Sequence, residues 1–224
     1  MSYKLGNKTI KTARVSGLLL AALALAVSFS IVTPASAQSV TPPPTPTAIT
    51  PPAGNSAFLV GHALGTQGYT CLPTSTGGTS WTINPARPEA TLFATVLGQP
   101  VQIITHFASI NANPNGKLPV ALGGNATWQS SFDTSKVWAA VLGPHSIPAG
   151  SDAASCPNTG SIPCLLLESI GNQKGPTGGN LLAQTTFVQR LNTNGGSAPT
   201  TTCSVGQTQL VPYTADYFFY RQDQ

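Results

Sequence analysis

The sequence predicts an all-β fold, an antiparallel β-sandwich or a closed β-barrel of about ten short strands with long loops. From Phe58 onward, short segments rich in β-branched and aromatic residues are separated by Gly, Pro and Asn. Outside the first 37 residues, no stretch keeps a helical period of 3.6 over more than two turns. Many short strands without helical crossovers favour a sandwich or a barrel over an α/β fold.

Residues 1–37 have the organisation of a cleaved signal peptide. The first 14 residues include Lys4, Lys8, Lys11 and Arg14, and an apolar run follows over residues 18–32. Ala35-Ser36-Ala37 is the small-x-small pattern that signal peptidase recognises, so we expect cleavage between Ala37 and Gln38. The apolar run is about 15 residues, shorter than the roughly 20 that span a bilayer. We therefore favour a secreted or periplasmic protein, without stable membrane insertion after cleavage, over a retained membrane anchor.

Residues 38–54 form a Pro/Thr-rich segment with six prolines and no charged residue. Such a composition favours extended polyproline conformations and cannot build a hydrophobic core. We expect a disordered linker here, either a spacer that holds the domain away from a surface or a simple tail. A single β-rich domain is then expected over residues 55–224.

The strands of this domain are predicted from runs of apolar and alternating residues. Residues 101–107 alternate between two faces, with Val101, Ile103 and Phe107 on one and Ile104 and His106 on the other. The stretch 108–126 is rich in Asn, Gly and Pro and predicts a long loop, a length that is uncommon unless the loop is functional or mobile. The predicted strands are Phe58–Ala63, Gln67–Leu72, Trp81–Ile83, Thr91–Val96, Val101–Phe107, Thr127–Ser130, Val137–Leu142, Leu165–Ser169, Leu182–Leu191 and Leu210–Tyr220.

The charge pattern argues against nucleic acid as a partner. The formal net charge of +4 comes entirely from the first 37 residues, because residues 38–224 hold as many acidic as basic residues. Binding of nucleic acid or of anionic lipid requires clustered Lys and Arg, and the basic residues of the domain are scattered.

Cysteine and histidine spacing gives no sign of a metal site. The four cysteines, Cys71, Cys156, Cys164 and Cys203, fit two disulfides in an oxidising compartment. A zinc site would need close pairs such as C-x2-C or nearby histidines, and neither is present. No G-x-G-x-x-G motif follows a strand, so we also expect no nicotinamide cofactor.

Polar residues inside strand-like segments are the candidates for a site. His106 is either a general base or a residue that hydrogen-bonds within the domain. Arg190 and Asp216 lie among apolar residues, where charges are rarely buried unless paired. We expect them to form an ion pair with each other or with Asp133 or Lys136, or else to belong to a polar cluster at the mouth of the β scaffold.

Aromatic residues complete the candidate site. Exposed aromatic rings stack on sugars, but most of the main aromatics are expected in the core, with at most two exposed: Trp81, Trp128, Trp138, Tyr69, Tyr213, Tyr217 and Tyr220. The candidate polar or ligand site is His106, Trp128, Asp133, Gln189, Arg190 and Asp216.

An ordered series of motifs gives the chain a family resemblance. The motifs are Gly65–Cys71, Pro88–Leu92, His106, Trp128-Gln129, Asp133–Val137, Ile162–Leu167, Val188–Pro199, Cys203 and Val211–Tyr220. Together, from about Asn55 to Tyr220, they resemble the domain-of-unknown-function family 3455 of secreted bacterial and fungal proteins. This resemblance implies no established activity.

The resemblance also implies a disulfide pairing. Cys71 and Cys203 fall on the two cysteine positions of the family, whereas Cys164 stands where members often have Trp and Cys156 is additional. We therefore expect bridges Cys71–Cys203 and Cys156–Cys164. The loop 108–126 is longer than in compact members of the family.

Three functions are compatible with these observations. The first is an exported domain that binds a neutral, glycan-like ligand or a cell-surface component, and the sequence favours it because no catalytic signature is present. The second is an extracytoplasmic enzyme with a polar site around His106, Asp133, Arg190 and Asp216. The third is a structural surface protein.

Overall fold

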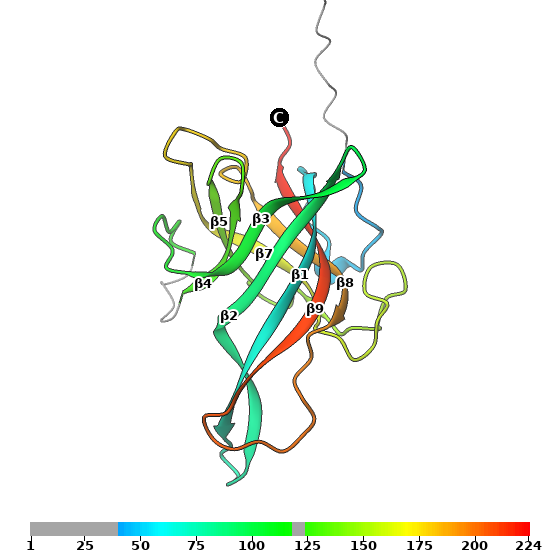
Figure 1. The fold of residues 1–224 in the computed structure, drawn as a ribbon. Helices are drawn as coiled ribbons and strands as arrows, with labels where there is room; N and C mark the ends of the chain where they lie inside the picture. The colour runs from blue at the N-terminus through cyan, green and yellow to red at the C-terminus, as the bar shows by residue number, and fades with distance from the viewer. Residues whose placement is uncertain (1–39, 118–123) are drawn as a thin grey trace, which may run out of the picture. The chain divides into compact units, whose positions relative to one another are not determined.

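Antiparallel strands make up the regular structure of residues 40–117 and 124–224, the part of the chain that the computed structural model describes. The expected signal peptide and its cleavage site at Ala37 and Gln38 lie outside the described residues. The elements are the 3-10 helix η1 (Thr47–Ile49) and the strands β1 (Asn55–Pro73), β2 (Thr79–Val96), β3 (Gln99–Ser109), β4 (Asn125–Ser130), β5 (Lys136–Ala140), β6 (Ser146–Ile147), β7 (Cys164–Gln173), β8 (Phe187–Gly195) and β9 (Thr208–Gln222) (Figure 1).

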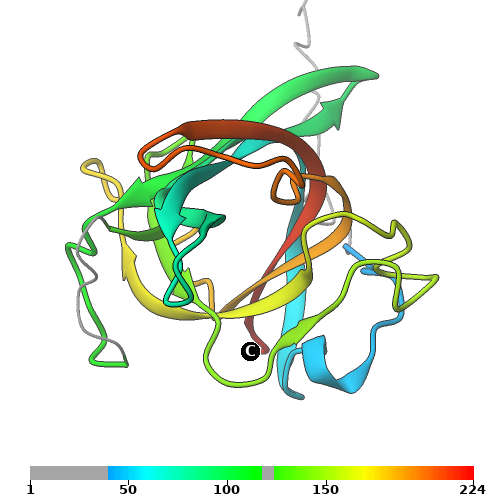
Figure 2. The ribbon, with the colours of Figure 1, turned by 90° about the horizontal axis from the view of Figure 1, so that it is seen from below.

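The predicted all-β fold is confirmed, and the described strands close into a ring. Each strand pairs with its neighbours in the order β5-β4-β3-β2-β1-β9-β8-β7, and β5 also pairs with β7. The short strand β6 adds to β7 outside this ring. Figure 2, seen from below, shows the strands surrounding a common centre. Of the two predicted architectures, the connectivity is that of the barrel, which leaves no long unpaired strand edge.

Two pairs of predicted short strands are each one long strand. β1 runs without a break through Gly65 and Gly68, and its register with β2 shifts between Gln67 and Tyr69. β2 likewise continues through the proline-containing segment 85–88. The sequence signals that suggested separate strands are therefore irregularities within continuous strands, since glycine marks bulges and bends as well as turns. In Figure 1 these two long strands extend, together with β9, beyond the rest of the ring.

The observed bounds of β8 differ from those of the predicted strand. The predicted strand 182–191 begins only at Phe187 and continues to Gly195. The register of β8 with β9 shifts between Leu191 and Asn194, and Asn192 has a φ of 50°. The Asn-Gly run after residue 191 is thus a bulge within a strand. Of the long loop predicted over 108–126, residues 110–117 and 124 lie between β3 and β4, and residues 118–123 are outside the described part of the chain.

Apolar side chains form two separate cores on opposite faces of the sheet. On β9, Tyr213, Tyr217 and Phe219 join the core that is built from all strands of the ring, whereas Phe218 and Tyr220 join a second core. Because neighbouring residues on a strand point to opposite faces, the first core is inside the ring and the second is outside it.

The segment 40–51, which we name the strap, covers the outer core. Ile49 is completely buried there, and the carbonyl of Ile49 accepts a hydrogen bond of 2.6 Å from Nε2 of Gln189. The ring of His145 donates from Nδ1 to the carbonyl of Ala48 at 2.8 Å. The expectation of a disordered linker over 38–54 is therefore wrong for residues 40–54. A single apolar residue among the prolines finds a buried site, and two hydrogen bonds fix the backbone around it.

Both disulfides have the pairing that the family resemblance implied. Cys71 is linked to Cys203, and Cys156 to Cys164. The first joins β1 to the segment before β9, and the second closes a loop just before β7. In the described residues, no helix is both long and apolar enough to cross a membrane.

Candidate functional site

Polar and aromatic side chains gather on the inner face of the ring, within and beside the inner core. We name this group the inner cluster: Tyr69 from β1, His106 from β3, Trp128 from β4, Arg190 from β8, and Tyr213 and Tyr217 from β9. His106 lies directly opposite Trp128 in the register of β3 and β4, and Arg190 lies directly opposite Tyr217 in that of β8 and β9. Residues that are paired in this way share a face, with Cβ atoms about 5 Å apart.

His106 and Trp128 form the stacked base of the inner cluster. Their rings are parallel within 9°, with centroids 4.3 Å apart, and both side chains are buried. Nδ1 of His106 donates to the carbonyl of Thr127 at 2.9 Å. Burial lowers the pKa of His106 to about 4; the hydrogen bond to Thr127 opposes the shift, and the positive charge of Arg190 adds to it. At neutral pH the ring is therefore uncharged.

Arg190 brings a positive charge to the inner cluster without an acidic partner. Its alternation with Gln189 and Leu191, which contact the outer core, puts its side chain on the inner face with Val188. The residue is partly buried. Its Nε and Nη2 donate to the carbonyl of Pro163 at 3.2 and 2.9 Å. The rest of the guanidinium fork has no acceptor among the described residues.

None of the Asp and Glu carboxylates of the chain is the partner of Arg190. All six Asp and Glu residues lie in the described part, and none forms an ion pair with Arg190. The predicted ion pair of Arg190 with Asp216 or Asp133 is therefore wrong. Asp216 lies on the outer face of β9, with His62 and Asn192, and the carboxylate of Asp133 bonds to Ser135 and Leu181.

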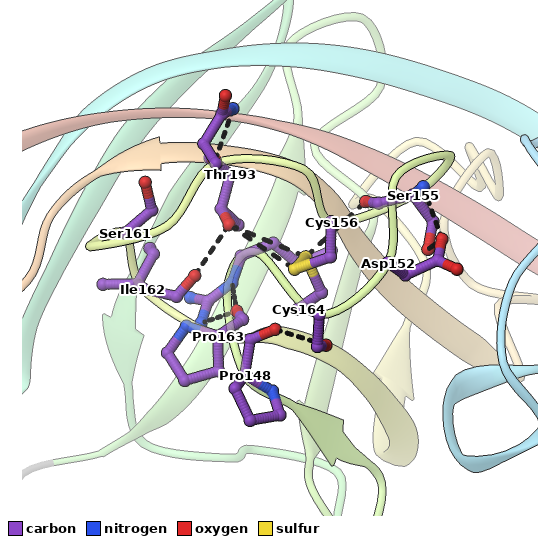
Figure 3. Close-up of a disulfide and its surroundings, with 12 residues drawn as sticks. Pro148, Asp152, Ser155, Cys156, Ser161, Ile162, Pro163, Cys164 and Thr193 are labelled. Atoms are coloured by element: carbon purple, nitrogen blue, oxygen red, sulfur yellow. Dashed lines mark hydrogen bonds between the residues drawn. A yellow bond between two sulfur atoms is a disulfide. The ribbon is translucent and has the colours of Figure 1, made fainter.

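The disulfide loop before β7 positions the acceptor of Arg190. Figure 3 shows Cys164, bonded to Cys156, directly after Pro163, with Thr193 beside them. The hydroxyl of Thr193 donates to the carbonyl of Ile162 at 2.7 Å. The backbone of residues 162–164 is thus held on both sides, and its Pro163 carbonyl orients the guanidinium.

The three tyrosines add neutral polar groups. The hydroxyls of Tyr213 and Tyr217 share a hydrogen bond of 3.0 Å, and the hydroxyl of Tyr69 donates to the carbonyl of Gly196 at 2.6 Å. Burial raises the pKa of Tyr213, as does its contact with Tyr217, whereas the charge of Arg190 opposes the rise. Burial also raises the pKa of Tyr69, again against Arg190. Tyr69 and Tyr213 therefore stay protonated at physiological pH and can donate hydrogen bonds.

One buried donor of the inner cluster is unsatisfied. Nε1 of Trp128 is buried and has no hydrogen-bond partner among the described residues. An unpaired buried N–H costs about 1–3 kcal/mol, and such groups are rare in native proteins. The inner cluster therefore holds two sets of donors without acceptors: Nε1 of Trp128, and the N–H groups of Arg190 that do not bond to Pro163.

The other three candidate residues lie elsewhere. Asp133 is in the β4–β5 turn, where Oδ1 accepts from Ser135 and Oδ2 accepts from the backbone N–H of Leu181. Burial acts to raise the pKa of Asp133, but hydrogen bonds from Ser135, Leu181 and Ser130 outweigh it and lower the pKa to about 2. The Asp133 carboxylate ties two turns together.

Gln189 and Asp216 both face outward. Gln189 is fully buried beneath the strap, with Oε1 accepting from the hydroxyl of Tyr220 at 2.6 Å. Asp216 accepts from Nδ1 of His62 at 2.6 Å and from Nδ2 of Asn192 at 2.8 Å. The side chain of His62 is 61% exposed, so this pair is on the surface.

Sequence reasoning thus found His106, Trp128 and Arg190 of the inner cluster and missed the role of the three tyrosines. The expectation that most of the aromatics are buried is confirmed for these three, but it gave their hydroxyl groups no role. The signal for Tyr213 and Tyr217 was their spacing of four on a strand, which puts them on one face with their hydroxyls in reach. The contact of His62 with Asp216 depends on the β1–β9 register, which local sequence does not give.

The inner cluster is suited to binding an anion. It combines a partly buried cation with neutral donors, and Nδ1 of His106 is engaged by the carbonyl of Thr127 rather than by a carboxylate. Within the described residues, no group of three or more His, Cys, Asp or Glu side chains is placed to hold a metal ion.

Comparison with known proteins gives the chain a family. The family described as "Protein of unknown function (DUF3455)" matches residues 52–221. No curated protein and no solved structure matches the chain. Since the match spans most of the chain and agrees with the resemblance seen in its motifs, the protein belongs to the family of unknown function DUF3455.

Proposed function

We propose that the protein is an exported binding domain that takes a small organic anion at the inner cluster. One observation supports this above the others. Arg190 is a partly buried guanidinium on the inner face, and no carboxylate of the chain neutralises it.

The physical argument rests on the cost of an unpaired charge. Guanidinium groups away from bulk water are normally paired, because attraction between opposite charges strengthens as the local dielectric falls. The planar fork of Arg matches the two oxygens of a carboxylate, and such bidentate pairs are among the strongest hydrogen bonds in proteins. A bound carboxylate would accept from the N–H groups that Pro163 leaves free.

The neighbours of Arg190 suit a ligand with an organic body. Tyr69, Tyr213 and Tyr217 offer hydroxyls and ring edges, and the unsatisfied Nε1 of Trp128 is a further donor. Sites for small molecules commonly join apolar and aromatic walls to a few placed polar groups. An acidic sugar has both a carboxylate and an organic body. The proposed ligand is therefore still glycan-like, as the sequence suggested, but it is negatively charged rather than neutral.

Export is part of the same proposal. Residues 1–37 have the features of a cleaved signal peptide, and the two disulfides fit an oxidising compartment outside the cytoplasm. We propose binding rather than catalysis because the inner cluster offers a charge and neutral donors but no paired acid and base.

A matched panel of ligands tests the proposal. Thermal unfolding is followed with benzoate, glucuronate and citrate, each beside a neutral analogue (benzamide, glucose, triethyl citrate) at constant ionic strength. We expect at least one carboxylate to raise the melting temperature by about 5 °C or more at a hundredfold excess over its Kd. Its neutral analogue should have no effect.

Two variants link this binding to Arg190. Arg190→Gln removes the charge and should abolish the shift, whereas Arg190→Lys keeps the charge but loses the fork and should retain part of it. Arg221→Gln is the control, because that guanidinium lies over the ring of Phe58, and it should bind normally. Shifts by neutral analogues alone, or equal shifts in Arg190→Gln, would contradict the proposal.

A further inference from the structure

A second polar site lies on the outer face of the ring, where β4, β5 and the end of β7 meet. It is a groove of about 360 Å³, which we name the lysine groove, lined by Gln129, Thr134, Lys136, Gln173, Lys174 and Pro176. Lys136 is opposite Gln129 on one side and opposite Gln173 on the other in the strand register. Since Trp128 and Val137 point into the inner core, their neighbours Gln129 and Lys136 point outward.

The two lysines of this groove are unpaired. Lys117, in contrast, forms an ion pair with Glu168. Lys136 and Lys174 have no acidic partner among the described residues, which include every Asp and Glu of the chain. The carboxylate on the adjoining turn, Asp133, is occupied by hydrogen bonds to Ser135 and Leu181. The groove therefore concentrates positive charge on a domain with balanced charge.

The walls of the groove are fixed by contacts between two turns. Asp133 accepts from the N–H of Leu181 at 2.8 Å, and the hydroxyl of Ser135 accepts from the N–H of Leu182 at 2.9 Å. Gly175 packs so closely on the carbonyl oxygen of Asp133 that a Cβ at this position would lie 1.8 Å from it. The turns carrying Thr134 and Lys174 are thus held together before any ligand arrives, which lowers the cost of binding.

We propose that the lysine groove binds an acidic polysaccharide. The ammonium groups of Lys136 and Lys174 would pair with carboxylates of successive sugar residues. The amides of Gln129 and Gln173 can both donate to and accept from hydroxyl groups, the arrangement that recognises a sugar rather than a bare polyanion. This site is separate from the inner cluster and does not depend on the function proposed for it.

Binding to immobilised alginate, a polymer of uronic acids, tests the proposal. We expect the protein to be retained on alginate and not on neutral dextran, and to elute as the salt concentration rises. A double variant, Lys136→Gln with Lys174→Gln, should bind alginate about tenfold more weakly or not at all. A second double variant, Gln129→Ala with Gln173→Ala, should also weaken binding while leaving the charge unchanged.

Two controls separate this site from other sources of binding. Lys117→Gln removes one positive charge outside the groove and should leave retention within about twofold of the original, as should Arg221→Gln, whose guanidinium lies over the ring of Phe58. Absence of retention, retention unchanged in the lysine double variant, or equal retention on immobilised double-stranded DNA would each overturn the proposal. Loss of retention in Arg190→Gln would assign the polysaccharide to the inner cluster instead.

Discussion

The chemistry of the inner cluster depends on single residues whose charge is set by their surroundings. His106 is uncharged because burial and Arg190 both oppose its protonation. Arg190 keeps its charge at any physiological pH and has no carboxylate beside it. The contrast makes Arg190 the only cation among the six residues of the cluster at neutral pH.

The pKa of His106 gives a prediction for stability against pH. In the unfolded chain His106 binds a proton below about pH 6.5, but the folded protein binds it only below about pH 4. The unfolded state therefore holds more protons between these values, and stability should fall by about 3 kcal/mol as the pH is lowered through this window. Urea denaturation at a series of pH values measures this change in the free energy of unfolding.

Substitution of His106 separates its contribution from those of other groups. In His106→Gln the slope of stability between pH 6.5 and 4 should largely disappear, whatever the stability of the variant at pH 7. His145→Gln, the control for removing a histidine elsewhere, should keep the slope. An unchanged slope in His106→Gln would show that the buried ring is not the group responsible.

At the same scale, the sequence identified which residues were unusual but not which way they face. His106, Arg190 and Asp216 were all chosen as polar residues in apolar strands, yet Asp216 is on the outer face. A side chain changes face with every residue, and a bulge reverses the alternation beyond it. The register shifts beside Asn192 and between Leu92 and Phe93 come from the assembled sheet, so the sequence alone could not place these side chains.

At the scale of elements, the strap is the segment whose structure departs most from its sequence signals. Its prolines predict an extended chain, and most of it is extended. The buried Ile49 and the carbonyls that accept from Gln189 and His145 attach it to the outer core. Composition could not reveal this, because the site that receives Ile49 is built from β6, β7, β8 and β9.

This attachment predicts a measurable cost for loss of one side chain. Ile49→Ala removes a completely buried side chain and should lower the free energy of unfolding by about 2–5 kcal/mol. Ile110→Ala is a matched control, since Ile110 is 70% exposed and should cost less than about 0.5 kcal/mol. Chemical denaturation compares the two. Equal small costs would mean that the strap does not contribute to the stability of the domain.

At the scale of the whole molecule, the all-β fold and the two disulfides were the more predictable features. Alternating apolar residues, turn residues and the absence of helical periodicity were sufficient for an antiparallel β fold. The closing pair of β5 and β7 was not predictable, since it joins strands that are short and separated by β6. The pairing of β1 with β9 is what brings strands from both ends of the domain together beside the inner cluster.

The two disulfides should differ in their effects on this ring. Cys71–Cys203 spans a sequence separation of 132 residues and Cys156–Cys164 one of 8, so their loss should cost about 5 and about 2.5 kcal/mol in the chain-entropy description. Two double variants, Cys71→Ser with Cys203→Ser and Cys156→Ser with Cys164→Ser, are compared by urea denaturation. The comparison shows which bridge contributes more to stability. The short bridge, however, holds the backbone next to Pro163, so its removal should weaken anion binding more than removal of the long one. A reversed order of stabilities would contradict the entropic account.

The central claim, that Arg190 receives an anionic group, is tested most directly by observing its guanidinium. The chain has four arginines, Arg14, Arg87, Arg190 and Arg221, so the Nε–Hε signals in an NMR spectrum are few, and comparison with Arg190→Lys assigns that of Arg190. The carboxylate that stabilises the protein best is titrated against its neutral analogue at constant ionic strength. The account predicts a saturable shift of the Arg190 signal with the carboxylate only, with the other arginines unchanged. An Arg190 signal that stays fixed, or that moves no more than the signal of Arg221, would contradict it.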